Sequence, residues 1–362
     1  MMTDDNPTPR VIGGVDTHKD VHVAAVLDEL GRLLATATFA TTTVGYRDLY
    51  RWLCRHGEVL AVGVEGTGSW GAGLSRHLRA RGVNVIEVNR TNRQTRRRKG
   101  KSDTVDAEAA ARAVLAGDAT VIPKSGDGPV EAVRQLRLAR NGAMKARTAA
   151  ANQLHSLTDT APDELRAKLR TLTTLQRAKT CARLRLDEIA TPAGAAKRAL
   201  RSVASRWLGL HLEVRELDKA IKHVLDEIAA PLLQRHGVGY ETVGALLCAA
   251  GDNPERLDTE AGFAALCGTS PVRVSSGKTN RHRLNRAGDR HANSALWTIV
   301  MVRIRSKHAP TINYIERRTT DGLSKREAMR CLKRYVAREI YNDIRAITST
   351  TTTTNEETNI AA

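Results

Sequence analysis

Aromatic residues are scarce in this chain: they make up 3 % of its 362 residues, and two of them are phenylalanine. RRM and OB folds bind single-stranded nucleic acid by stacking bases on aromatic side chains, so we expect neither fold here. The five cysteines form no CxxC pair. This argues against a structural zinc site and against a disulfide framework.

Long apolar runs are also missing. No stretch approaches the roughly 20 apolar residues needed to span a bilayer, and the polar start MMTDDNPTPR is not a signal peptide. We therefore expect a cytoplasmic protein in a reducing compartment, with no membrane partner. The length and the 41 % hydrophobic content are sufficient for two or three domains with real cores.

Acidic residues are fewer than basic residues in this chain. The chain has 57 Lys and Arg against 39 Asp and Glu, a net charge of +18, which suits a polyanionic partner. One group of cations stands directly before an acidic pair: Arg93, Arg96, Arg97, Arg98, Lys99 and Lys101. Their placement favours nucleic-acid binding, because cations beside carboxylates make sense where a phosphate backbone must be drawn over a bound metal. A solvated loop or helix start is the alternative.

Four carboxylates stand where a two-metal nuclease would have them. Asp16 and Glu65 each end a short β-branched run, as expected for the ends of two strands. Asp103 and Asp106 begin an alanine-rich helix and, three residues apart, share one of its faces. Such acids can hold two divalent ions about 4 Å apart. Each acid alone is more simply a turn or capping residue, but the four in this order favour a metal site.

Hydrophobic periodicity predicts an α/β domain over residues 1–125. Three hairpin-connected strands are followed by alternating helices and strands, which is the order of an RNase H-like (RuvC-like) fold. The predicted strands are 11–16, 21–27, 33–39, 59–65 and 83–88, and the predicted helices 44–56 and 70–81.

Residues 126–230 show almost no strand pattern and are predicted to be helical. Apolar residues from Leu200 to Ile228 alternate in spacing between three and four, giving an a/d seam of about four heptads, as in a coiled coil. The seam could close on a helix near 130–157 as an antiparallel hairpin, or form a dimer interface. A mainly α region, 231–346, follows, and the threonine-rich tail, 347–362, is predicted to be disordered.

The third region contains two motifs. Its start, with a Gly-Val-Gly turn over 237–239, resembles a helix-hairpin-helix whose N–H groups can hold a DNA phosphate. Further on, Ser275 and Ser276 precede a glycine and the cations Lys278, Arg281, Arg283 and Arg286. Taken alone, this block is more simply a polar loop that only contacts DNA. The alternative is a flexible loop with a serine nucleophile, in which arginines stabilise charge on phosphorus.

Taken together, these blocks resemble the insertion-sequence 110 family of transposases. They follow the family order over about Val11 to Ile344, and the set is far more specific than any single block. The matching segments are 14–20 (GVDTHKD), 64–68 (VEGTG), 101–107 (KSDTVDA), 268–271 (GTSP) and 275–278 (SSGK).

The resemblance implies a DEDD-type RuvC-like domain and a C-terminal serine transposase domain. Such a nucleoid-associated recombinase excises and inserts its own mobile element, directed by a structured non-coding bridge RNA that pairs with double-stranded donor and target DNA. The resemblance also implies dimers that pair into a tetramer, in which acids and serine of different protomers complete one site. It places Mg²⁺ on Asp16, Glu65, Asp103 and Asp106 and a phosphoserine on Ser276. His18 is expected to be incidental, with a role near the metal left open.

Two other functions fit parts of the pattern. A RuvC-like Holliday-junction or structure-specific nuclease would attack with metal-activated water, and its C-terminal region would only bind DNA. A non-catalytic nucleic-acid-binding factor would keep the nuclease fold without its activity. Two catalytic constellations in one basic chain fit strand transfer better, because a covalent protein–DNA bond conserves the phosphodiester energy needed for rejoining.

Overall fold

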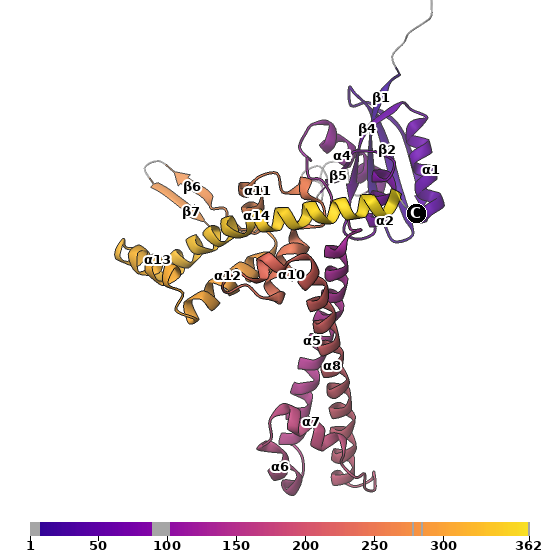
Figure 1. Cartoon of the computed structure of the whole chain (residues 1–362). Helices are drawn as coiled ribbons and strands as arrows, with labels where there is room; N and C mark the ends of the chain where they lie inside the picture. Colours follow the sequence, from indigo (N-terminus) through magenta and orange to yellow (C-terminus); the bar gives the residue numbers. More distant parts are fainter. Residues whose placement is uncertain (1–7, 89–101, 277–278, 284, 361–362) are drawn as a thin grey trace, which may run out of the picture. The chain divides into compact units, whose positions relative to one another are not determined.

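The computed structural model describes residues 8–88, 102–276, 279–283 and 285–360 (Figure 1). Its N-terminal part is a five-stranded sheet in the order β3-β2-β1-β4-β5, compatible with an RNase H-like fold. β2 pairs antiparallel with β1 and β3, whereas β4 runs parallel to β1 and β5. The predicted order of elements is confirmed: β1 Arg10–Thr17, β2 Val21–Asp28, β3 Leu33–Ala40, α1 Thr43–Cys54, β4 Glu58–Glu65, α2 Ala72–Arg79, β5 Val85–Val88 and α4 Asp103–Leu115.

Helices cover both faces of this sheet. Alternate residues of a strand point to opposite faces. Val11 and Val15 of β1 pack in one cluster with Leu49 and Leu53 of α1 and with the buried leucines of α2. On the other face, Ile12 of β1 packs with residues of α4.

α4 lies unusually close to the sheet because two glycines face it. A methyl group on Gly14 would lie 2.2 Å from the carbonyl oxygen of Ala107 and 2.3 Å from the amide nitrogen of Ala111. On the neighbouring strand, a methyl group on Gly63 would lie 2.8 Å from the carbonyl oxygen of Ala110. These are backbone atoms of α4, so the helix itself would have to move to make room.

We therefore expect Gly14→Ala to destabilise the protein by about 3 kcal/mol, because overpacking a tight contact forces backbone shifts. Thermal melting followed by circular dichroism measures the loss. Gly68→Ala is the matched control, since nothing lies within 4 Å of a methyl group there. Equal melting temperatures for the two variants would contradict the close packing.

A histidine lies in the core between this sheet and α1. His22 is fully buried, and neither ring nitrogen has a hydrogen-bond partner among the described residues. Its ring stacks on Tyr46 of α1, with centroids 5.6 Å apart. Burial lowers the pKa of His22 below its ordinary value of 6.5, because the charged form loses its hydration.

The lowered pKa makes stability depend on pH. Because the unfolded state binds the proton more readily, the free energy of unfolding falls as the pH drops below about 6.5. His22→Phe removes this contribution and keeps a ring against Tyr46. We expect its melting temperature to fall less than that of the wild type between pH 7.5 and pH 5.5, conditions chosen to bracket about 6.5. Equal falls would show that His22 is not the group that titrates.

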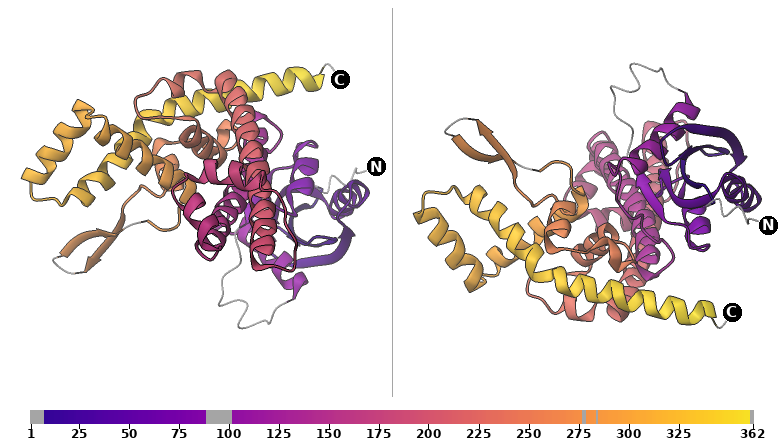
Figure 2. Two further views of the ribbon diagram at one scale, coloured as in Figure 1. Left: turned by 90° about the horizontal axis from the view of Figure 1, so that it is seen from below. Right: turned by 90° about the horizontal axis from the view of Figure 1, so that it is seen from above.

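The segment after residue 128 is helical, with one β-hairpin that projects from the helices in both views of Figure 2. α5 and α8 pack antiparallel: Arg140 bonds Asp218 at 2.5 Å, and Arg147 Nη1 lies 3.3 Å from His211 Nδ1. Of the two alternatives for the heptad seam, the structure therefore has the hairpin within the chain. Its elements are α5 Pro129–Asp159, α6 Asp163–Arg170, α7 Thr174–Ala182, α8 Pro192–Ile228, α9 Ala230–Leu233, α10 Tyr240–Ala250, η1 Pro254–Arg256, α11 Glu260–Leu266, β6 Val272–Ser276, β7 Thr279–Arg283, α12 Arg290–Arg305, α13 Ala309–Thr320 and α14 Lys325–Ile360.

The threonine-rich tail differs from the prediction of disorder. α14 begins at Lys325 and continues through the threonine run to Ile360. Extending a helix that is already formed costs less than starting one, so residues of modest helix propensity can follow turns that are anchored by the buried Leu332, Val336 and Ile340. None of the helices in the described ranges is long and apolar enough to cross a membrane.

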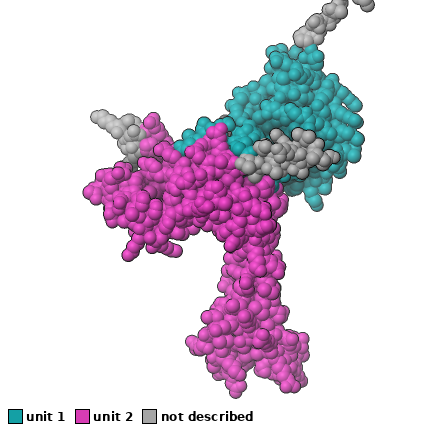
Figure 3. Space-filling model, viewed as in Figure 1, with its two compact units in different colours: residues 1–128, 250–263, 348–362 teal, residues 129–249, 264–347 magenta. Residues whose placement is uncertain are grey.

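The chain divides into two compact units (Figure 3). Unit 1 comprises residues 1–128, 250–263 and 348–362, and unit 2 comprises 129–249 and 264–347. The division into 1–125, 126–230 and 231–346 remains a prediction about functional parts.

Unit 1 contains a short piece of chain from far along the sequence. Asn253 is 2 % exposed; its Oδ1 accepts from the Ser125 amide at 2.9 Å, and its Nδ2 donates to the Pro123 carbonyl at 3.2 Å. Arg256 Nε donates to the Ile122 carbonyl at 2.7 Å. Residues 250–263 thus satisfy backbone groups of the segment that leaves the α/β domain.

Candidate active site

The first two predicted acids lie side by side at one edge of the sheet. β1 and β4 are parallel and pair Val15 with Val64, so Asp16 and Glu65 follow at adjacent positions. Thr17 Oγ1 ties the strand ends together by donating to the Glu65 carbonyl at 2.8 Å. Each acid lies two residues beyond a glycine that faces α4, so both belong to the face that α4 covers.

The other two acids lie in the first turn of α4. Asp106 is buried, at 4 % exposure, whereas the side chain of Asp103 is 52 % exposed. Partial positive charge at a helix N-terminus favours carboxylates there. The glycine contacts that draw α4 onto the sheet therefore also bring these acids to the strand ends.

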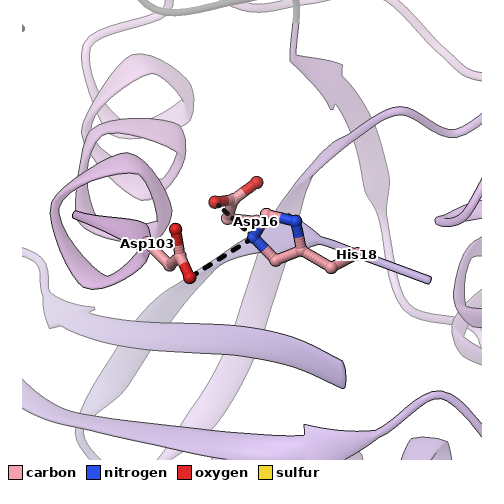
Figure 4. A group of neighbouring side chains, drawn as sticks. All are labelled: Asp16, His18 and Asp103. Atoms are coloured by element: carbon pink, nitrogen blue, oxygen red, sulfur yellow. Dashed lines mark ion pairs between the residues drawn. The ribbon is translucent and has the colours of Figure 1, made fainter. Parts of the chain in front are cut away.

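His18 lies between acids of the two elements (Figure 4). Its Nε2 is 3.2 Å from Asp16 Oδ2 and 3.5 Å from Asp103 Oδ2. One ligand atom from each of the three residues lies within 4.8 Å of the others. The structure thus groups two predicted ligands with a residue that the sequence suggested was incidental. Glu65 and Asp106 are not members of this group of three.

The charges at this edge repel one another. The pKa of Asp16 is raised, first by burial and then by the negative charges of Asp106 and Asp103, while His18 acts in the opposite direction. A carboxylate pushed towards its neutral form by other carboxylates is stabilised by a cation. Carboxylate oxygens suit Mg²⁺ or Mn²⁺, whereas an imidazole nitrogen is a ligand typical of Zn²⁺ or iron. The residues present therefore fit a divalent metal.

The cationic group predicted before Asp103 lies outside the described residues. This applies to Arg93, Arg96, Arg97, Arg98, Lys99 and Lys101. Their part in binding nucleic acid stays a prediction.

The serine block differs from the predicted flexible loop. Its flanks form an antiparallel ribbon in which Ser275 pairs with Asn280 and Ser276 with Thr279. Two strand-like runs separated by a Gly-x pair are a hairpin signal, and the prediction of a loop overlooked it. Arg283, in β7, and Arg286, before α12, are exposed. Lys278 and the side chains of Ser276 and Arg281 lie outside the described part.

The Gly-Val-Gly turn is less available to DNA than its resemblance to a helix-hairpin-helix suggested. Gly237 has φ +79°, and the amides of Val238 and Gly239 donate to the Arg235 carbonyl and to Thr242 Oγ1. Those two N–H groups are therefore already satisfied. Arg303 holds the turn by donating to the His236 carbonyl at 2.8 Å.

The sheet order and its acidic edge are compatible with the RNase H-like class of proteins. Two family models match the chain. The model for the DEDD domain of IS110 elements, described as a transposase, matches residues 13–163, and the model described as the IS116/IS110/IS902 transposase family matches residues 229–316. Together these ranges cover more than half of the chain. A comparison with curated proteins found no match.

The chain belongs to the IS110 family of transposases. The first match contains Asp16, Glu65, Asp103 and Asp106, and the second contains Ser275 and Ser276. Both candidate sites thus lie within domains typical of the transposase of an insertion sequence.

Proposed function

We propose that the protein cuts and rejoins the DNA of its insertion sequence through a phosphoserine intermediate, guided by a structured bridge RNA. The observation that carries this proposal is the convergence of Asp16, Asp103 and His18 at the edge of the sheet, in a chain whose second family domain carries a serine pair. Hydrolysis needs only the first of these sites. Strand transfer uses both.

In this proposal Asp16, Glu65, Asp103 and Asp106 hold Mg²⁺. When bound, such ions stabilise negative charge on the oxygens of a phosphoryl group in transfer. The buried Asp16 and Asp106 would fix the position of the site, and the exposed Asp103 would lie nearest to solvent and substrate. His18 would orient Asp16 and Asp103 through its Nε2.

Ser276 is the proposed nucleophile. Its Oγ loses a proton and forms a bond to phosphorus, and the bond from phosphorus to one deoxyribose oxygen breaks, leaving a DNA hydroxyl. The reverse step transfers the phosphoryl group to another DNA hydroxyl and restores the serine, with no net hydrolysis. Lys278, Arg281, Arg283 and Arg286 would stabilise the charge on phosphorus.

The partners follow from the family resemblance. They are double-stranded DNA at the element ends and target, the bridge RNA, and further copies of this chain, as dimers that pair into a tetramer. The net charge of +18 supports polyanionic partners.

The test is to trap the intermediate. The full chain is incubated with bridge RNA, Mg²⁺ and labelled element DNA, then denatured and separated on a gel. We expect label to migrate with the protein, and to be lost when EDTA replaces Mg²⁺. Cleaved DNA without any covalent adduct would instead favour the Holliday-junction nuclease, and no cleavage of any substrate would favour a non-catalytic binding factor.

A further inference from the structure

Unit 2 contains a cleft beside the serine hairpin, lined by residues of β7, α13 and α14. Its volume is about 640 Å³, in the range of ligand sites. Seven of the described lining residues are arginine or lysine, whereas Glu327 is the one carboxylate among them. Glu327 also accepts hydrogen bonds from the backbone and side chain of Ser324 at the start of α14. The wall of the cleft is therefore strongly cationic.

One of these cations is deep in the cleft wall. Lys333 is 8 % exposed, and its Nζ donates to Asn293 Oδ1 at 2.8 Å. Within the described ranges it forms no salt bridge with a carboxylate. Burial lowers its pKa, and the charge of Arg330 lowers it further. Burying an ammonium group without a counter-charge is costly, so an anion at this place would relieve both effects.

Two tyrosines add a surface for flat rings. Tyr314 and Tyr335 meet edge to face with centroids 5.4 Å apart, and Tyr335 is 51 % exposed. Arginines accompany both: Arg317 lies 5.6 Å from the centroid of Tyr314, and Arg338 lies 6.0 Å from that of Tyr335. Proteins that bind single strands combine cations that contact the phosphates with aromatic rings on which the bases stack.

We propose that this cleft binds an unpaired strand of nucleic acid, with phosphates on Arg317, Arg330 and Lys333 and a base stacked on Tyr335. Cations alone would accept a duplex equally well. The exposed ring of Tyr335 favours an unpaired strand, because the faces of bases inside a duplex are covered by neighbouring bases and cannot stack on it. The inference rests on the proposed function in one respect: strand transfer passes through unpaired segments.

Binding is tested with the full chain in EDTA, so that no cleavage is required. Fluorescence anisotropy measures the affinity for labelled oligothymidylate, oligouridylate and a duplex of equal length. We expect Tyr335→Leu to weaken single-strand binding about tenfold, from the value of one stacked base, and to leave duplex binding unchanged. Tyr335→Phe should bind as the wild type does. Whether DNA or RNA binds more tightly identifies the natural strand.

The cations are tested by salt dependence. In the double variant Arg317→Gln, Arg330→Gln, the slope of log K against log salt should fall by about 0.7 for each phosphate that the protein no longer neutralises. Arg326→Gln is the control, an exposed arginine of α14 that does not line the cleft. Unchanged affinity and slope in the arginine double variant would overturn the proposal, and so would equal losses of single-strand and duplex binding in Tyr335→Leu.

This result is separable from the proposed function. Asp16→Asn lies in unit 1 and should bind the oligonucleotides as the wild type does. If the wild type forms no phosphoserine but its single-strand binding still depends on Tyr335, the proposed transposase mechanism is contradicted and the proposed binding role of the cleft is retained. If transposition proceeds without dependence on Tyr335, only the binding role of the cleft is contradicted.

Discussion

Asp16→Asn should lower metal-dependent DNA cleavage by at least about 1,000-fold, because several kcal/mol of charge stabilisation depends on the bound metal. The change keeps the shape of the side chain, removes its charge and replaces one carboxylate oxygen by an NH₂ group. Binding of nucleic acid should remain, since affinity comes mainly from the many cations. Cleavage of labelled element DNA and anisotropy with the same DNA measure the two effects separately.

Asp20→Asn is the matched control for this prediction. Asp20 is an exposed carboxylate four residues further along, outside the group formed by Asp16, His18 and Asp103. It should cleave at the wild-type rate. Near wild-type recombination in Asp16→Asn would exclude Asp16 as a required ligand.

Ser276→Ala should abolish the covalent DNA adduct, whereas Ser275→Ala should retain it. The two hydroxyls are chemically alike, and the choice rests on sequence context: Ser276 directly precedes Gly277, and glycine permits close approach of a phosphate to the backbone. Proteolysis of the trapped adduct and mass spectrometry locate the modified residue. A phosphate on Ser275 would reverse the assignment. DNA cleavage retained in the double variant would indicate attack by water.

The strands were predictable because apolar residues alternate or run almost continuously along them, as from Val21 to Leu27, where His22 is the one polar residue. The acids at the strand ends followed from the same runs. The depth at which α4 packs was not predictable, since nothing in the local sequence says that Gly14 and Gly63 face Ala107 and Ala110 across a tertiary contact.

His18 was undervalued for a similar reason. Its position depends on the turn from β1 to β2, where its amide donates to the Val21 carbonyl at 3.0 Å. This turn returns the ring towards Asp16, and only the packing of α4 brings Asp103 to the same ring nitrogen. The cleft was not predicted because its tyrosines and cations come from three elements that are apart in the sequence. A low overall aromatic content also does not predict that the few aromatic rings cluster at one place.

The segment around Asn253 limits where the chain can be cut or joined to a related chain. It completes unit 1, yet it is encoded within the second family match, residues 229–316. A fragment ending at residue 128 would leave the carbonyls of Ile122 and Pro123 without Arg256 and Asn253. The two family domains are therefore not interchangeable modules: a chimaera joined at that boundary must inherit both halves from one parent or carry a matching Asn253 segment. Residues 129–249 are, in this sense, an insertion into unit 1, and residues 250–263 must match the segment 122–125 that they bond.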